Sequence, residues 1–109
     1  ISMYAVIFEV KPKTELAAQD YFDLAAELRT ELEEIDGFIS VERFSSLSDK
    51  DKFLSISFWR DEKALKQWRE HHQHRKAQQK GRGEIFKDYR IIVAKVIRDY
   101  GITNRTEAP

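Results

Sequence analysis

The apolar segments of this chain have large apolar side chains on both faces, and this pattern restricts the fold more than any other feature. The segment Tyr4–Val10 places aromatic and branched side chains on one face and Ala5 and Ile7 on the other. The segment Tyr89–Tyr100 places isoleucine and valine on both faces. Successive side chains of a strand point to opposite faces, and an antiparallel sheet commonly leaves one face in water. A sheet of these segments therefore needs an apolar cover on each side.

A long amphipathic helix and a hairpin are expected after the first strand. Thr14 is a suitable N-cap, and apolar residues then recur every three or four positions over residues 17–35. Gly37 supplies a left-handed stop. Beyond it, Phe38–Phe44 and Phe53–Trp59 are rich in β-branched and aromatic residues, and the polar stretch between them predicts the turn of a hairpin.

A second helix is expected after Asp61, another suitable N-cap. One face of it holds Leu65, Trp68 and His72, and a short third helix is expected through Arg75–Lys80. The order strand-helix-strand-strand-helix-strand is the ferredoxin-like α+β pattern, with a four-stranded antiparallel sheet. Two helices cover only one face of such a sheet. We therefore expect a homodimer, in which a second copy of the chain covers the other face.

Length and composition exclude several classes of protein. A chain of 109 residues has room for one domain, which we assign to residues 3–100. Ile1 and Ser2 precede the only methionine and are left out of the fold, and residues 101–109 are expected to form a mobile tail. The absence of cysteine excludes thiolate chemistry and suits a cytoplasmic location. The 19 basic and 19 acidic residues cancel, which argues against nucleic-acid binding, and no apolar run reaches the ~20 residues of a membrane span.

The zero net charge hides an uneven distribution along the chain. Acids dominate Glu15–Asp36, whereas basic residues dominate Arg69–Arg82, which also contains His71, His72 and His74. Two interpretations remain open: solvated helix faces of opposite sign, or a positive field at the mouth of a pocket for an anionic or phenolic ligand. A metal site is disfavoured because the neighbouring basic side chains repel cations.

Two consecutive segments resemble elements of the antibiotic biosynthesis monooxygenase family. They are Ser57–Trp68 (SFWRDEKALKQW) and His71–Gln78 (HHQHRKAQ). The first strand, the turn at Asp36–Phe38 and the last strand fit as well, so the resemblance spans about residues 3–101. It implies a dimeric α+β barrel with a pocket between the sheet and the second helix. Some members oxidise phenols or quinols with O₂ and no cofactor, others degrade haem, and many have no established activity.

The functional residues of the family transfer only in part. Trp68 matches the pocket tryptophan of both branches. The quinone-forming branch has a tyrosine where this chain has His74 and an asparagine where it has Ala64. The haem-degrading branch has its ligand histidine where Gln78 stands, and an asparagine on the first strand, which Tyr4–Val10 lacks. Haem degradation is therefore disfavoured.

Two functions follow from these residues. In the first, the protein is a cofactor-independent monooxygenase of a small aromatic phenol or quinol. Trp68 forms a wall of the pocket, His74 takes the phenolic proton and Arg82 stabilises the oxyanion, while Trp59 and His72 complete the substrate site. Each residue also has a structural interpretation: core tryptophans, surface histidines and a solvated loop arginine.

In the second function, a non-catalytic or stress-related dimer holds a hydrophobic ligand in the same pocket. Neither function uses a metal or another cofactor.

Overall fold

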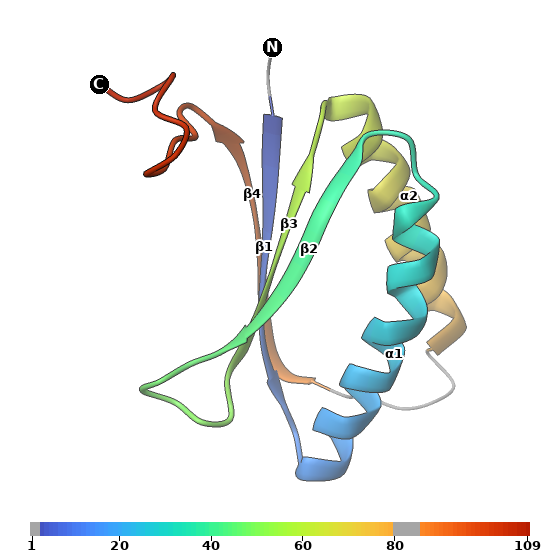
Figure 1. Ribbon diagram of the computed structural model, residues 1–109. Helices are drawn as coiled ribbons and strands as arrows, with labels where there is room; N and C mark the ends of the chain where they lie inside the picture. The colour runs from blue at the N-terminus through green and yellow to red at the C-terminus, as the bar shows by residue number, and fades with distance from the viewer. Residues whose placement is uncertain (1–2, 80–85) are drawn as a thin grey trace.

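The structure of the protein, a computed structural model, describes residues 3–79 and 86–109, with the backbone alone described at 72–79, 86 and 87. Its elements follow the predicted order (Figure 1). They are β1 (Met3–Pro12), α1 (Glu15–Glu33), β2 (Phe38–Ser45), β3 (Phe53–Trp59), α2 (Glu62–Gln79) and β4 (Phe86–Val96).

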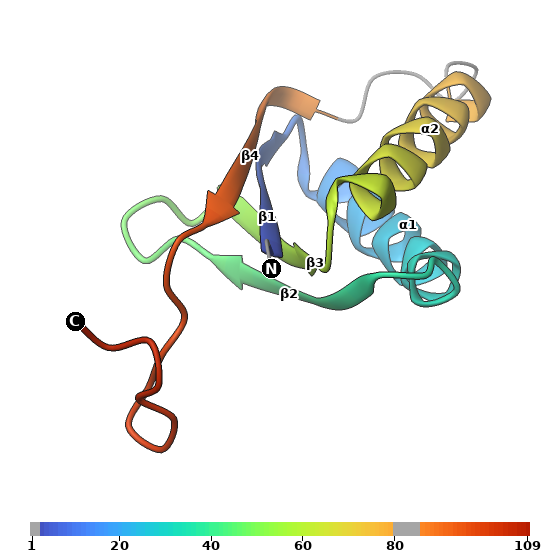
Figure 2. The same ribbon diagram turned by 90° about the horizontal axis from the view of Figure 1, so that it is seen from above.

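The four strands form one antiparallel sheet in the spatial order β2-β3-β1-β4. The two central strands are β1 and β3, and the edges are β2 and β4. Both helices lie side by side on the same face of this sheet (Figures 1 and 2). This arrangement is the ferredoxin-like α+β fold, as the order of the sequence segments predicted.

Both predicted helix caps are present. The Thr14 hydroxyl accepts a hydrogen bond from the backbone N–H of Ala17 at 3.0 Å. The Asp61 carboxylate accepts one from the backbone N–H of Ala64 at 2.9 Å. Each bond satisfies a donor of the first helical turn that has no partner within its own helix. These caps fix where the helices begin relative to the strands before them.

The turn between α1 and β2 locks the sheet to the start of α2. Gly37 has φ +99°, and a Cβ there would lie 2.6 Å from the Cβ of Ala64, so only glycine fits. Its carbonyl accepts a 2.8 Å hydrogen bond from the Arg60 backbone. The Arg60 guanidinium binds both carboxylate oxygens of Asp36 at 3.1 Å. The Arg60 guanidinium holds the pKa of the Asp36 carboxyl below its ordinary value.

Two predicted elements differ from the observed ones. The expected short third helix is absent, because α2 continues unbroken to Gln79 and no glycine or proline interrupts residues 62–79. The last strand was predicted as Tyr89–Tyr100 but spans Phe86–Val96. Its last residue, Val96, pairs with Met3 of β1.

The core lies between the sheet and the two helices. Its buried members come from β1, α1, β3 and α2. They are Val6, Leu32, Trp59 and Ala64. Side chains from both helices thus contact the helix-facing side of the two central strands, which holds the start of α2 firmly against the sheet.

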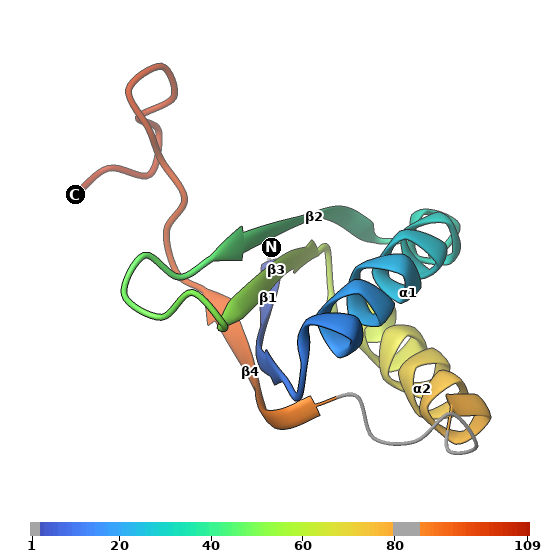
Figure 3. The same cartoon turned by 90° about the horizontal axis from the view of Figure 1, so that it is seen from below.

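Neither α1 nor α2 lies over the opposite side of the sheet (Figures 2 and 3). The pairing of β1 with β3 and β4 places a continuous set of apolar side chains there, which we call the open face. The open face comprises Ala5, Ile7, Leu54, Ile56, Phe58, Ile92 and Ala94. Phe44 of β2, paired with Leu54, extends it and is 46% exposed. The doubly apolar strand pattern is therefore present as predicted.

Candidate functional site

A pair of tryptophans marks the helix-facing side of the sheet near the start of α2. Trp59, at the end of β3, is 0% exposed, and its indole N–H donates a 2.9 Å hydrogen bond to the Ser57 hydroxyl. The Trp68 ring lies 6.1 Å from the Trp59 ring at an angle of 58°. Phe38 packs edge-on against Trp59 at 5.3 Å. The buried Trp59 thus packs against the Trp68 ring. Trp68 itself is only half-buried, so part of its surface remains accessible to a ligand.

Trp68 reaches this position because α2 presents one face to the sheet. Ala64 of that face is fully buried, and Leu65 and Trp68 pack against the core. Trp68 lies one helical turn after Ala64 and Leu65. At the start of α2, the Tyr4 hydroxyl donates a 2.8 Å hydrogen bond to the Glu62 carboxylate, which ties β1 to the first turn.

The helices leave part of β4 uncovered. Tyr89 and Val93 pair with Val10 and Val6 of β1, and therefore share the helix-facing side with these buried residues. Yet Tyr89 is 48% and Val93 55% exposed. Apolar surface is thus accessible on the helix-facing side of the edge strand, in the same layer as Trp68.

Three of the predicted site residues lie outside the described side chains. His72 and His74 are residues of α2 for which the structure describes the backbone but not the side chain. The same holds for Gln78. Arg82 lies outside the described residues altogether. Of the five predicted residues, the structure therefore brings together Trp59 and Trp68.

One histidine has a partner that the sequence did not reveal. The Nε2 of His71 on α2 lies 2.8 Å from a carboxylate oxygen of Glu31 on α1. The contact forms because α1 lies alongside α2 (Figure 3). The acidic first helix beside the basic second helix was the available signal.

A second cluster of aromatic side chains fills the space between α1 and the sheet, away from the two tryptophans. Tyr21 of α1 is buried against Phe8 of β1, with ring centres 6.5 Å apart. Phe22 packs edge-on against Phe53 at 5.0 Å. Burial raises the pKa of the Tyr21 phenol, and the nearby Arg43 guanidinium opposes that rise. This end of the layer is filled by side chains from the protein itself.

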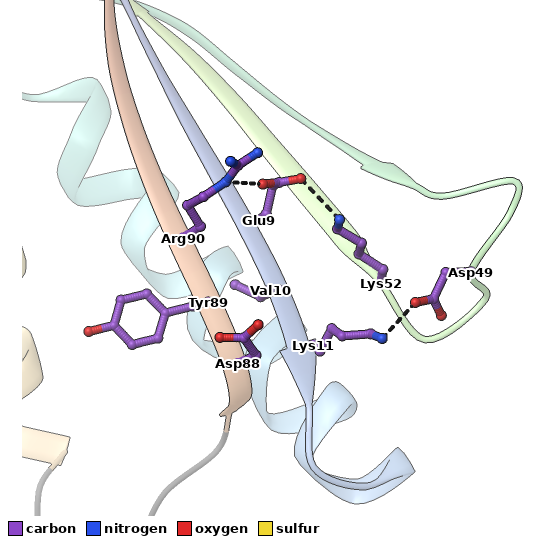
Figure 4. A pocket seen from close by; sticks show the side chains of 8 residues that line it. All are labelled: Glu9, Val10, Lys11, Asp49, Lys52, Asp88, Tyr89 and Arg90. Atoms are coloured by element: carbon purple, nitrogen blue, oxygen red, sulfur yellow. Dashed lines mark hydrogen bonds and ion pairs between the residues drawn. The ribbon is translucent and has the colours of Figure 1, made fainter.

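A charged pocket of about 310 Å³ lies around Glu9, which continues the open face beyond Ile7 of β1 (Figure 4). At its centre, the Glu9 carboxylate contacts Arg90 at 2.6 Å and Lys52 at 3.1 Å. Lys11 pairs with Asp49 at 2.7 Å. Hydrogen bonds from Arg90 and Lys52 hold the pKa of the Glu9 carboxyl below its ordinary value. Five of the six charged side chains that line the pocket are therefore engaged in ion pairs with one another, and Asp88 is the sixth.

No group of three or more metal-ligating side chains occurs within the described part of the chain. Neither of the two helices, over the residues described for them, is long and apolar enough to cross a membrane.

Comparison with known proteins places the chain in a family. The sequence model of the family described as Antibiotic biosynthesis monooxygenase matches residues 3–80. A Pyricularia oryzae protein named jasmonate monooxygenase ABM is 47% identical over 94 residues, which cover 86% of this chain and 43% of that protein. The chain thus spans less than half the length of this curated relative.

Solved structures share the fold at low sequence identity. Rv0793 from Mycobacterium tuberculosis has a TM-score of 0.75 and 20% identity, covering 91% of this chain and 99% of that one. SnoaB, a cofactor-independent oxygenase from Streptomyces nogalater, has a TM-score of 0.66 and 10% identity, covering 89% and 95%. The predicted family and fold are both confirmed. The chain belongs to the antibiotic biosynthesis monooxygenase family.

Proposed function

We propose that this protein is a monooxygenase that oxidises a small, electron-rich aromatic compound with O₂ and without a cofactor. The observation that supports it most is the half-buried Trp68, held against the fully buried Trp59 on the inner face of α2. A rigid indole offers a large flat surface to an aromatic ring. The exposed helix-facing side chains of β4, Tyr89 and Val93, supply further apolar surface in the same layer.

The proposed reaction needs no external reductant when the substrate is a phenol with an activated CH₂ group, such as an anthrone. Loss of one proton gives an electron-rich anion that reacts with O₂ at carbon. One oxygen atom becomes the new carbonyl, and the other leaves as water with the two hydrogens of the CH₂ group. The substrate supplies all four electrons that reduce O₂. The protein therefore has to orient the substrate, accept a proton and stabilise the anion.

These tasks are assigned to named residues. Trp68 is the proposed wall of the site, and Trp59 holds it in place. The proton acceptor is proposed to be an imidazole of α2, for which the sequence nominates His74, and His72 is proposed to line the same site. Arg82 is proposed to stabilise the anionic oxygen, since a guanidinium donates charge-assisted hydrogen bonds to such a group.

We also propose that the working unit is a homodimer formed through the open face. Soluble monomers rarely expose a contiguous apolar patch larger than a few hundred Å². The open face extends over β1, β3 and β4 with Phe44 at its margin. Glu9 and its two cations lie at one end, so a second copy would meet apolar side chains at the centre and charges at the rim. That is the usual anatomy of a stable interface.

The name of the Pyricularia relative adds jasmonate to the ligands worth testing. Hydroxylating an ordinary C–H bond with O₂ consumes two further electrons, so such a substrate requires an added reductant. The need for a reductant therefore separates that chemistry from oxidation of an anthrone or quinol. The alternative, a binding protein of the same fold, predicts ligand binding without any oxygen consumption.

Oxygen uptake by extensively dialysed protein tests the proposal. With 1,8-dihydroxyanthrone and a chelator present, we expect uptake that saturates with substrate and scales with protein concentration. The rate should rise with pH and level off once the proton acceptor is neutral. Jasmonate, assayed with and without NADPH, serves as the comparison. Saturable binding of the anthrone with oxygen uptake no faster than in buffer would leave the binding protein as the correct function.

A further inference from the structure

The Glu31–His71 pair is the one contact in which an imidazole of the described side chains meets a carboxylate. It joins positions 40 residues apart, one on each helix, with 2.8 Å between Nε2 of His71 and Oε2 of Glu31. The two side chains are 32% and 36% exposed. Both are thus fixed in part by packing and remain accessible to a small molecule.

The pair lies at the edge of the layer that contains Trp68. His71 follows Trp68 by three positions on α2, so the two side chains leave the helix on neighbouring parts of the same face. Glu31 directly precedes Leu32, a buried member of the core. The imidazole is therefore held one helical turn from the proposed aromatic wall.

Stability alone explains this pair poorly. Partly exposed ion pairs contribute about 0–1 kcal/mol, because water screens them and two side chains must be ordered. A carboxylate that fixes one nitrogen of an imidazole has a chemical consequence that does not depend on stability. The hydrogen bond at Nε2 determines the tautomer of the neutral ring and leaves Nδ1 as its acceptor.

We infer that His71 is the proton acceptor of the site beside Trp68, and that Glu31 is its positioning residue. This inference rests on the proposed function, since it assigns the base of that reaction to His71 in place of His74. In the step, the O–H or C–H bond of the ligand breaks and an N–H bond forms at Nδ1. The resulting imidazolium lies against the Glu31 carboxylate, which stabilises the charge while the ligand anion lies over the indole.

The first test uses the free protein and needs no ligand. Long-range ¹H–¹⁵N NMR of the His71 ring at neutral pH should show its neutral form as one tautomer, with the proton on Nε2. In Glu31→Gln the tautomers should mix. A mixed population in the wild type, or no change in Glu31→Gln, would overturn the positioning role of Glu31.

The second test observes proton transfer without oxidation. Under anaerobic conditions, 1,8-dihydroxyanthrone is added at a pH where buffer alone leaves it neutral, and its anion is measured by visible absorbance. Quenching of tryptophan fluorescence reports binding separately. We expect anion formation on the wild type, a loss of at least about tenfold in Glu31→Gln, and a larger loss in His71→Gln, with binding retained. Glu70→Gln removes an exposed carboxylate next to His71 and should behave as the wild type.

The outcomes separate this inference from the proposed function. Anion formation that survives His71→Gln but disappears in His74→Ala would overturn the assignment while leaving the proposed function intact. An anthrone that fails to quench fluorescence in any variant would contradict the proposed function, and the tautomer of His71 would then decide the role of Glu31 by itself.

Discussion

Replacing Ile7 with glutamate is expected to convert a dimer into a folded monomer. Ile7 lies at the centre of the open face, between Ile56 of β3 and Ile92 of β4. In a monomer the new carboxylate reaches water, so the fold should survive. In the proposed dimer two such carboxylates would be buried without partners, at several kcal/mol each. The dissociation constant should therefore rise by at least about 10³-fold, since each 1.4 kcal/mol is a factor of ten.

Light scattering at micromolar concentration measures this directly. The wild type should give about twice the 12.9 kDa chain mass, and Ile7→Glu should give the chain mass with unchanged far-UV circular dichroism. Gln67→Glu, which adds the same charge at an exposed position of α2, is the matched control and should remain dimeric. A monomeric wild type, or a dimeric Ile7→Glu, would show that the open face is not the interface.

The two tryptophans are expected to respond to truncation in opposite ways. Trp59→Ala should lower the free energy of unfolding by about 3–5 kcal/mol, the usual range for a fully buried aromatic residue. It also removes the partner of the Ser57 hydroxyl. Trp68→Ala removes a half-buried ring and should cost about 1–3 kcal/mol. Its main effect should be on ligand affinity, because the flat surface beside the ligand disappears.

Urea denaturation and binding of 1,8-dihydroxyanthrone, followed by the absorbance of the ligand, measure both effects in the two variants. Trp68→Phe keeps an aromatic surface and should retain most of the affinity, which makes it the matched control for Trp68→Ala. Unchanged affinity in a folded Trp68→Ala would remove this residue from the site.

The sequence predicts the fold well where the determining signals are local. Thr14 and Asp61 act as caps through neighbours three residues along the chain. Gly37 ends the turn after α1 because of its own backbone conformation. The apolar pattern of each strand requires no knowledge of the other strands. These features place every element in its order, and the order specifies the ferredoxin-like sheet.

Features that depend on distant neighbours could not be predicted in the same way. The register of β4 against β1, in which Val96 pairs with Met3, involves residues more than 90 positions apart in the chain. The Glu31–His71 contact requires α1 to lie beside α2, a tertiary arrangement that helical periodicity does not specify. The sequence indicated that Trp59 and Trp68 belong to one region. Only the packing shows that Trp59 is the buried residue of the pair and Trp68 the accessible one.

Isotope labelling tests the central claim, that the protein inserts oxygen from O₂ without a cofactor, most directly. Dialysed protein with chelator is mixed with 1,8-dihydroxyanthrone under ¹⁸O₂, and the product is analysed by mass spectrometry as a function of protein concentration. The account predicts a quinone with one ¹⁸O atom, formed with one O₂ consumed per product, at a rate proportional to protein. Labelled quinone appearing no faster than in buffer, although the anthrone is bound, would contradict it.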